Sequence, residues 1–117
     1  MQFTVACASN SDTILNANLA RSPLFAAGVP LHLERDAPTA GIAYNRALDN
    51  TTAPVVVFAH HDVYLPQGWD KVLSARLAEV EAQDPNWALF GAFGVGLDHS
   101  HIGPVWSSSI GQIVGRV

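Results

Sequence analysis

The sequence predicts an α/β domain in which helices cover both faces of a mainly parallel sheet. Short apolar runs rich in β-branched residues alternate along the chain with segments of helical periodicity. The run 55–59 is uninterrupted, as expected of a central strand buried on both faces. The chain has 117 residues, 49% of them hydrophobic, which is enough for one domain with a sizeable core. We therefore expect a Rossmann-like three-layer sandwich over residues 1–117.

The first half of the chain is expected to contain two strand–helix units. Residues 3–8 form an apolar run, and the polar Ser-Asn-Ser-Asp segment after it predicts a turn into a helix that stops before Pro23. A second strand follows over 29–33. Thr39 is placed to cap a second helix that ends near Asn50.

The second half of the chain begins with the predicted strand 55–59. The clearest helical periodicity then starts at Trp69, runs for about four turns at 3.6 residues per turn and is ended by Asp84-Pro85. Five residues make up its expected inner face: Trp69, Val72, Leu73, Leu77 and Val80. The apolar run 87–93 predicts a fourth strand, and the Gly- and Ser-rich remainder predicts loops with short strands.

The expected order of the strands places a crevice at one edge of the sheet. If the first strand lies between the second and the third, the direction of winding reverses beside it, and a crevice opens at the carboxyl ends of these strands. The residues expected to line this crevice follow the first and third strands: Ser9, Asn10, His60 and Asp62.

Composition excludes several classes of partner. Only six Lys and Arg residues and a net charge of −4 argue against a nucleic-acid surface or a polybasic membrane patch. No signal-peptide pattern or membrane span is apparent, so a cytoplasmic location is expected. Cys7, the only cysteine, lies inside an apolar run. We therefore expect a buried structural thiol and no intrachain disulfide.

The most distinctive segment is residues 55–69, Val-Val-Val-Phe-Ala-His-His-Asp-Val-Tyr-Leu-Pro-Gln-Gly-Trp. It resembles the metal-binding segment of family-2-like glycosyltransferases of the GT-A fold, in which a buried strand ends in an Asp-x-Asp or related triplet. The subgroup that it resembles most has a His-x-Asp-Val triplet. Upstream, 41–47 is similar to the helix that precedes this strand in the family, and downstream 87–94 is similar to the next core strand.

This resemblance implies a domain that binds a nucleoside-diphosphate sugar through Mn²⁺ or Mg²⁺ and transfers the sugar to an unknown acceptor. It assigns the metal to Asp62 and places His60, Asp36, Ser9 and Asn10 around the donor. His60 stands where the family usually has the first carboxylate. The chain ends before the region in which the family supplies acceptor contacts and a catalytic base, so only the N-terminal, nucleotide-binding part is expected and no base is assigned.

Each of these residues also has a purely structural explanation. Asp62 is suited to a hard cation because such ions use one or two carboxylates together with substrate phosphates, but it could instead cap the turn into the next helix. Asp36 could be a solvated loop acid. Ser9 and Asn10 could cap the first helix. Along an extended strand neighbouring side chains point to opposite sides, so His60 rather than His61 is expected to face the crevice.

Two other functions fit parts of the sequence. The chain could be a non-catalytic nucleotide-sugar-binding or oligomerising module. Alternatively, His60 and Asp62 could form a two-His-one-carboxylate iron site with His99 or His101, although such sites usually occur on antiparallel β-barrels. An unpaired strand edge after Gly96 would favour self-association, so a homodimer is expected. Trp106 could stack on a sugar or belong to a core.

Overall fold

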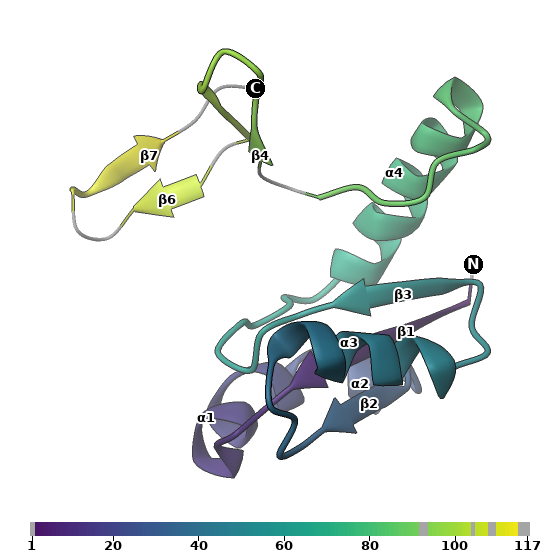
Figure 1. Cartoon of the computed structure of the whole chain (residues 1–117), viewed down its shortest axis with the longest axis vertical. Coiled ribbons are helices and arrows are strands. Elements are labelled where there is room, and N and C mark those ends of the chain that lie inside the picture. The colour runs from purple at the N-terminus through teal and green to yellow at the C-terminus, as the bar shows by residue number, and fades with distance from the viewer. Residues whose placement is uncertain (1, 92–93, 104, 108–109, 115–117) are drawn as a thin grey trace. The chain divides into compact units, whose positions relative to one another are not determined.

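The computed structural model divides the chain into two compact units, Met1–Ala78 and Glu79–Val117 (Figure 1). The residues that the structure describes are 2–91, 94–103, 105–107 and 110–114. The first unit contains a parallel sheet with helices on both faces, as the sequence predicts. The second unit contains short antiparallel hairpins.

The sheet of the first unit consists of β1 (Phe3–Ala8), β2 (Leu31–Glu34) and β3 (Val55–Phe58) in the order β2-β1-β3. All pairs are parallel, and Val5 of β1 lies opposite Leu31 on one side and Val57 on the other. The first strand lies between the second and the third, which is the arrangement on which the expected crevice depends. The direction of winding therefore reverses at β1.

The prediction that the strand 55–59 is central and buried on both faces is wrong for the described part of the chain. β3 is an outer strand of a three-stranded sheet, and Phe58 is 38% exposed. Val55 and Val57 pack against the main core cluster, whereas Phe58 lies on the other face beside Tyr44. An apolar run therefore does not distinguish a central strand from an outer one that is covered mainly on one face.

The expected first helix is broken into two pieces, α1 (Asp12–Ala17) and a 3-10 turn (Leu19–Arg21), and a short helix that was not predicted, α2 (Pro23–Ala26), follows them. Ser11 caps α1 by accepting a hydrogen bond from the Ile14 N–H. Pro23 begins α2 rather than ending the helical region, because proline needs no N–H partner in a first turn.

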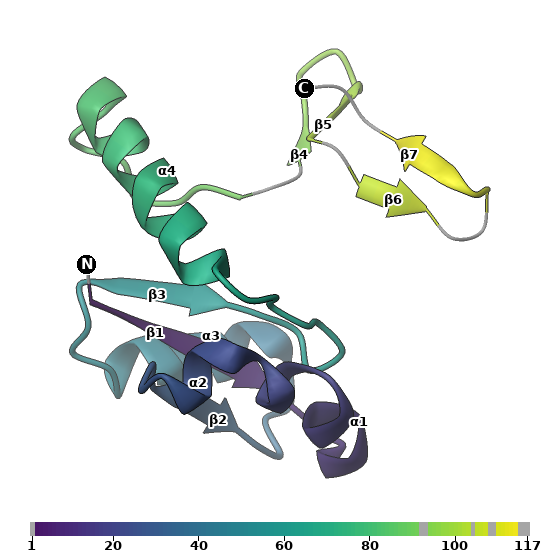
Figure 2. The ribbon, with the colours of Figure 1, turned by 180° about the vertical axis from the view of Figure 1, so that it is seen from behind.

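α3 (Ala40–Asp49) matches the prediction, and Thr39 caps it by accepting a hydrogen bond from the Ile42 N–H. Its Ala43 and Ala47 are fully buried, and the helix contacts β1 and β2. These small side chains let the helix approach the sheet closely. α1 and α2 lie on the opposite face from α3 (Figure 2).

The main core lies between β1 and the helices on the α1–α2 face. Phe3, Val5 and Cys7 point from β1 into this core and meet apolar residues from α1, the 3-10 turn and α2: Leu15, Leu19 and Leu24. Cys7 is only 1% exposed, so the prediction of a buried thiol is confirmed. Burial raises the pKa of this thiol to about 11, and the negative charge of Asp62 acts in the same direction.

α4 (Trp69–Gln83) confirms the predicted amphipathic helix in its bounds but not in its whole inner face. Leu77 is fully buried, and the Trp69 ring packs edge-on against Phe3 with ring centroids 6.4 Å apart. Val72, in contrast, is 58% exposed. The buried stripe of the helix is therefore narrower than the periodicity suggests.

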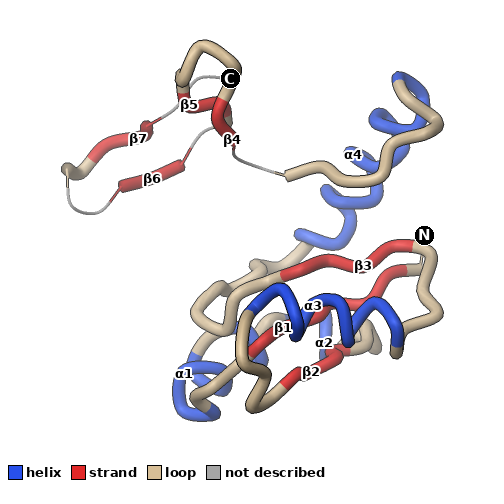
Figure 3. The backbone as a smooth tube through the Cα atoms, viewed as in Figure 1, coloured by secondary structure: helices blue, strands red, loops and turns tan. Residues whose placement is uncertain are grey.

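The second unit contains two hairpins, one of β4 (Gly94–Val95) with β5 (His101–Ile102) and one of β6 (Val105–Ser107) with β7 (Gln112–Val114), seen in Figure 3. The fourth strand expected over 87–93 does not form over 87–91, and residues 92–93 lie outside the described ranges. Glycine weakens strands, and three glycines fall within 91–96. No helix among the described residues is long and apolar enough to cross a membrane.

Candidate functional site

A cavity of about 310 Å³ lies at the carboxyl ends of the three parallel strands. Its walls come from the segments that follow β1 and β2, from the first turn of α3 and from the two histidines after β3. This is the edge at which ligands bind in open α/β sheets, because the loops on either side of the reversal point diverge there. A second cavity of about 680 Å³ lies at the opposite edge, lined in part by Thr4, Thr51 and Thr52.

Four of the five residues singled out in the sequence line the 310 Å³ cavity: Ser9, Asn10, Asp36 and His60. They follow the ends of all three strands, and Ser9 and His60 are 51 positions apart along the chain. The fifth residue, Asp62, is exposed and is not among the lining residues. Its carboxylate is close enough to the Cys7 thiol to raise the pKa of that group.

His61 also lines the cavity and was missed by the sequence argument. That argument assumed an extended strand, in which neighbouring side chains alternate. β3 ends at Phe58, however, and the Val63 N–H donates to the His60 carbonyl in a turn, 3.2 Å apart. In this turn the alternation of side chains along a strand no longer applies, and both histidines line the cavity.

The loop that carries the histidines is attached to the rest of the first unit at several points. Ser9 Oγ and His61 Nδ1 are hydrogen bonded at 3.0 Å. The Leu19 N–H donates to the His61 carbonyl, and the buried Leu65 N–H donates to Ser22 Oγ at 3.0 Å. These contacts hold the loop against β1 and the α1–α2 layer, so the cavity is organised without a ligand.

Two acidic residues line the β2 side of the cavity. Glu34 accepts a hydrogen bond from the His32 imidazole at 2.8 Å, which occupies one of its oxygens. Asp36 has a positive φ of 58°. Aspartate tolerates this left-handed conformation better than most residues, and residues held in it are common at ligand sites.

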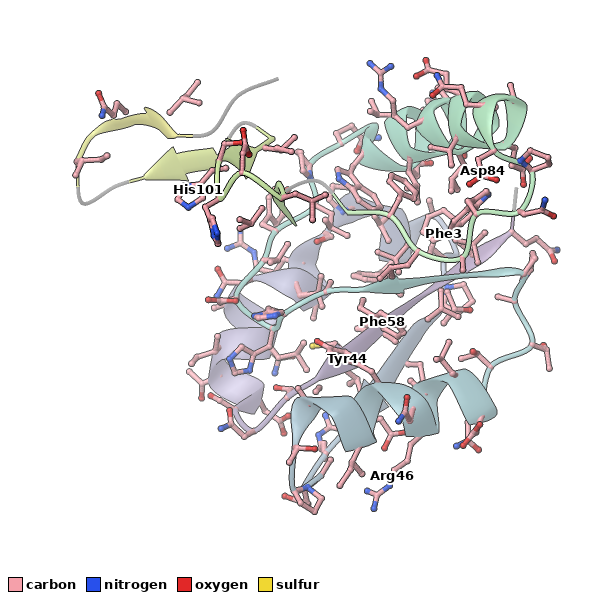
Figure 4. The ribbon with its side chains drawn as sticks, turned by 45° about the horizontal axis from the view of Figure 1, so that its top comes forward. Phe3, Tyr44, Arg46, Phe58, Asp84 and His101 are labelled. Carbon is pink, nitrogen blue, oxygen red and sulfur yellow. The ribbon has the colours of Figure 1, made fainter. Side chains whose placement is uncertain are left out.

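An aromatic pair lies beside the acidic wall. The rings of Tyr44 from α3 and Phe58 from β3 are 4.6 Å apart and tilted by 39° (Figure 4). Burial raises the pKa of Tyr44, with a further contribution from Cys7. Tyr44 also lines the cavity, together with the carboxylates of Glu34 and Asp36. Because its pKa is raised, its hydroxyl stays neutral there.

A divalent cation at this site would need oxygen ligands from a bound molecule. Within the described ranges, no three His, Cys, Asp or Glu side chains are grouped so that they could hold a metal ion. Asp62 offers one carboxylate and His60 one imidazole, which suits Mn²⁺ or Mg²⁺ only when phosphate oxygens complete the shell. His99 and His101, the other ligands of the iron alternative, belong to the second unit and are exposed.

Comparison of the chain with protein-family models, with curated proteins and with solved structures gave no match.

Proposed function

We propose that this domain binds a nucleoside-diphosphate sugar together with Mn²⁺ or Mg²⁺ and transfers the sugar to an acceptor. The observation that carries the proposal is the cavity at the reversal point of the sheet, where Ser9, Asn10, Asp36 and His60 meet. Its volume of about 310 Å³ lies at the lower end of the range for small-ligand sites.

The nucleoside is assigned to the β1–β2 side of the cavity. In this arrangement Asp36, which lines the cavity after β2, accepts hydrogen bonds from the ribose hydroxyls. An ionised carboxylate only accepts hydrogen bonds, and the ribose hydroxyls can donate them. Ser9 and Asn10 supply hydroxyl, amide and backbone groups for the base or ribose. The sugar and diphosphate then extend towards the histidines and Asp62.

The negative charge of the cavity is the reason for including a divalent cation in the proposal. Glu34 and Asp36 both line it, and the chain carries a net charge of −4, so a diphosphate would meet electrostatic repulsion. Asp62 would hold a divalent cation, which would offset that repulsion and would supply charge stabilisation for the departing nucleoside diphosphate. No residue is assigned as the catalytic base.

The test is thermal unfolding of the chain with EDTA, Mn²⁺, UDP or GDP, and Mn²⁺ plus nucleotide. A ligand that binds only the folded state adds about 2.7 kcal/mol of stability at one hundred times its dissociation constant. We expect nucleotide to raise the midpoint more with Mn²⁺ than without it. Asp62→Asn should remove that difference, whereas Asp49→Asn, at the exposed end of α3, should keep it.

A wild-type midpoint that responds to no nucleotide at millimolar concentration with metal would contradict donor binding by this chain. If nucleotide binds but no sugar is released or transferred from the nucleoside-diphosphate sugar, the domain is a binding module. That outcome is the alternative function considered from the sequence.

A further inference from the structure

We propose that two copies of this chain associate through the outer edges of their β3 strands, forming one continuous sheet across a twofold axis. Self-association was expected from the sequence at an edge after Gly96. In the structure Gly94–Val95 pairs with His101–Ile102, whereas β3 has β1 on one side and, among the described residues, no strand on the other. The proposal does not depend on nucleotide binding.

The backbone groups that point outward from β3 can be identified from its pairing with β1. The Ala59 N–H donates to the Ala6 carbonyl, so Ala59, Val57 and Val55 direct their polar groups towards β1. Val56 and Phe58 therefore direct their N–H and C=O groups away from β1. These unpaired groups form the template for another strand.

One antiparallel register pairs all of these outward groups within the strand. In this register Val56 of one copy lies opposite Phe58 of the second copy, and the two residues exchange two N–H···O=C hydrogen bonds. The twofold axis generates the equivalent pair, Phe58 of the first copy with Val56 of the second. Val57 then faces its own equivalent across the axis. Sliding the strands so that Val56 faces Val56 would place Phe58 opposite Pro54, which has no N–H to donate.

The chemistry of the edge favours a second copy as its partner. Residues 50–59 contain no charged side chain, and the strand itself contains no proline. Outer strands often avoid self-pairing through lysines, prolines or bulges, and none of these occurs within Val55–Phe58, although Pro54 precedes the strand and limits the registers open to it. Although the chain carries a net charge of −4, none of that charge lies along this edge. Two β3 edges can therefore approach each other without repulsion between like charges.

Side-chain contacts would stabilise the dimer in addition to the backbone hydrogen bonds between the two β3 strands. Phe58 is exposed on the α3 face, and the proposed register places Val56 of the second copy beside it. Strands of four residues form a small contact compared with the roughly 1,200–2,000 Å² of stable complexes. We therefore expect a dimer that dissociates on dilution.

The test combines sedimentation of the full chain with cysteine cross-linking. Sedimentation velocity over a range of concentrations should show a reversible shift towards twice the 12.5 kDa chain mass. In a Cys7→Ala background, Val57→Cys should form a covalent dimer on oxidation, because facing non-hydrogen-bonded residues lie about 4.5 Å apart at Cα, within disulfide reach. Val56→Cys is the matched control and should cross-link at least tenfold less.

A chain that sediments as a monomer at every concentration would overturn the proposal, since the edge would then be covered by the chain itself or by solvent. Cross-linking of Val56→Cys in preference to Val57→Cys would also overturn it, because the strands would be paired in the other register. If the Val57→Cys chain fails to fold, the concentration dependence of the unsubstituted chain still decides the outcome.

Discussion

At the scale of single residues, the His61 side chain is held beside the end of β1 by a hydrogen bond between its Nδ1 and Ser9 Oγ, 3.0 Å apart. Asp36 was expected near the donor only from the family resemblance, and the expectation that Asp62 lines the crevice is wrong. The sequence places polar residues after the first and third strands, and this was enough to predict that Ser9, Asn10 and His60 gather in one cavity lining. It could not predict the part played by His61, because the end of β3 at Phe58 depends on pairing with β1. The contact of His61 with Ser9, 52 positions away, is a tertiary one.

Cys7 provides a prediction at the same scale. Its pKa of about 11 in the folded chain lies above the ordinary value of 9.0, so the folded state favours the neutral thiol. The stabilisation from this group is complete below about pH 9 and is lost as the pH rises through 11. We expect the free energy of unfolding to fall more steeply over this interval in the native chain than in Cys7→Ala.

Urea unfolding of both proteins at several alkaline pH values measures this difference. Most other groups that ionise over the same interval are common to the two chains and cancel in the comparison. Tyr44 is the exception, because Cys7 contributes to its raised pKa and that contribution is absent in Cys7→Ala. Equal pH dependence would show that Cys7 ionises as easily in the folded chain as in the unfolded one.

At the scale of elements, periodicity and caps predicted α3 and α4 correctly because both helices have local signals. Thr39 caps the first, and a long apolar stripe marks the second. The break near Asn18 has no comparable local signal. Over 87–91 the glycines within 91–96 weaken a strand, but they do not by themselves exclude one. Whether an apolar run becomes a strand depends on a neighbouring edge to pair with, which lies outside the run itself.

α4 offers a direct comparison of two apolar residues on one helix. Leu77 is fully buried and Val72 is 58% exposed. Leu77→Ala should lower the free energy of unfolding by roughly 2–5 kcal/mol, whereas Val72→Ala should change it by less than about 0.5 kcal/mol. Chemical denaturation of the two variants measures both values, and equal costs would mean that the buried stripe of α4 is wrongly assigned.

At the scale of the whole molecule, the alternation of strands and helices predicted a parallel sheet with helices on both faces. The sequence offered the order with the first strand between the second and the third only as a condition, and the structure has that order, β2-β1-β3, with the cavity at the carboxyl edge. The same reasoning failed for the position of β3, because its run of valines is equally compatible with a central and an outer strand. The side-chain composition of a strand predicts how apolar its surroundings are, but it does not predict whether the strand has one neighbouring strand or two.

The central claim is that a nucleoside diphosphate binds at the carboxyl edge of the sheet, and amide chemical-shift mapping tests it most directly. Titration of the ¹⁵N-labelled chain with UDP or GDP and Mg²⁺ should shift the backbone amides of Ser9, Asp36 and His60, which line the 310 Å³ cavity. The amides of Thr4 and Thr51, at the cavity on the opposite edge, should stay in place. Shifts confined to that opposite edge, or none at millimolar nucleotide, would contradict the account.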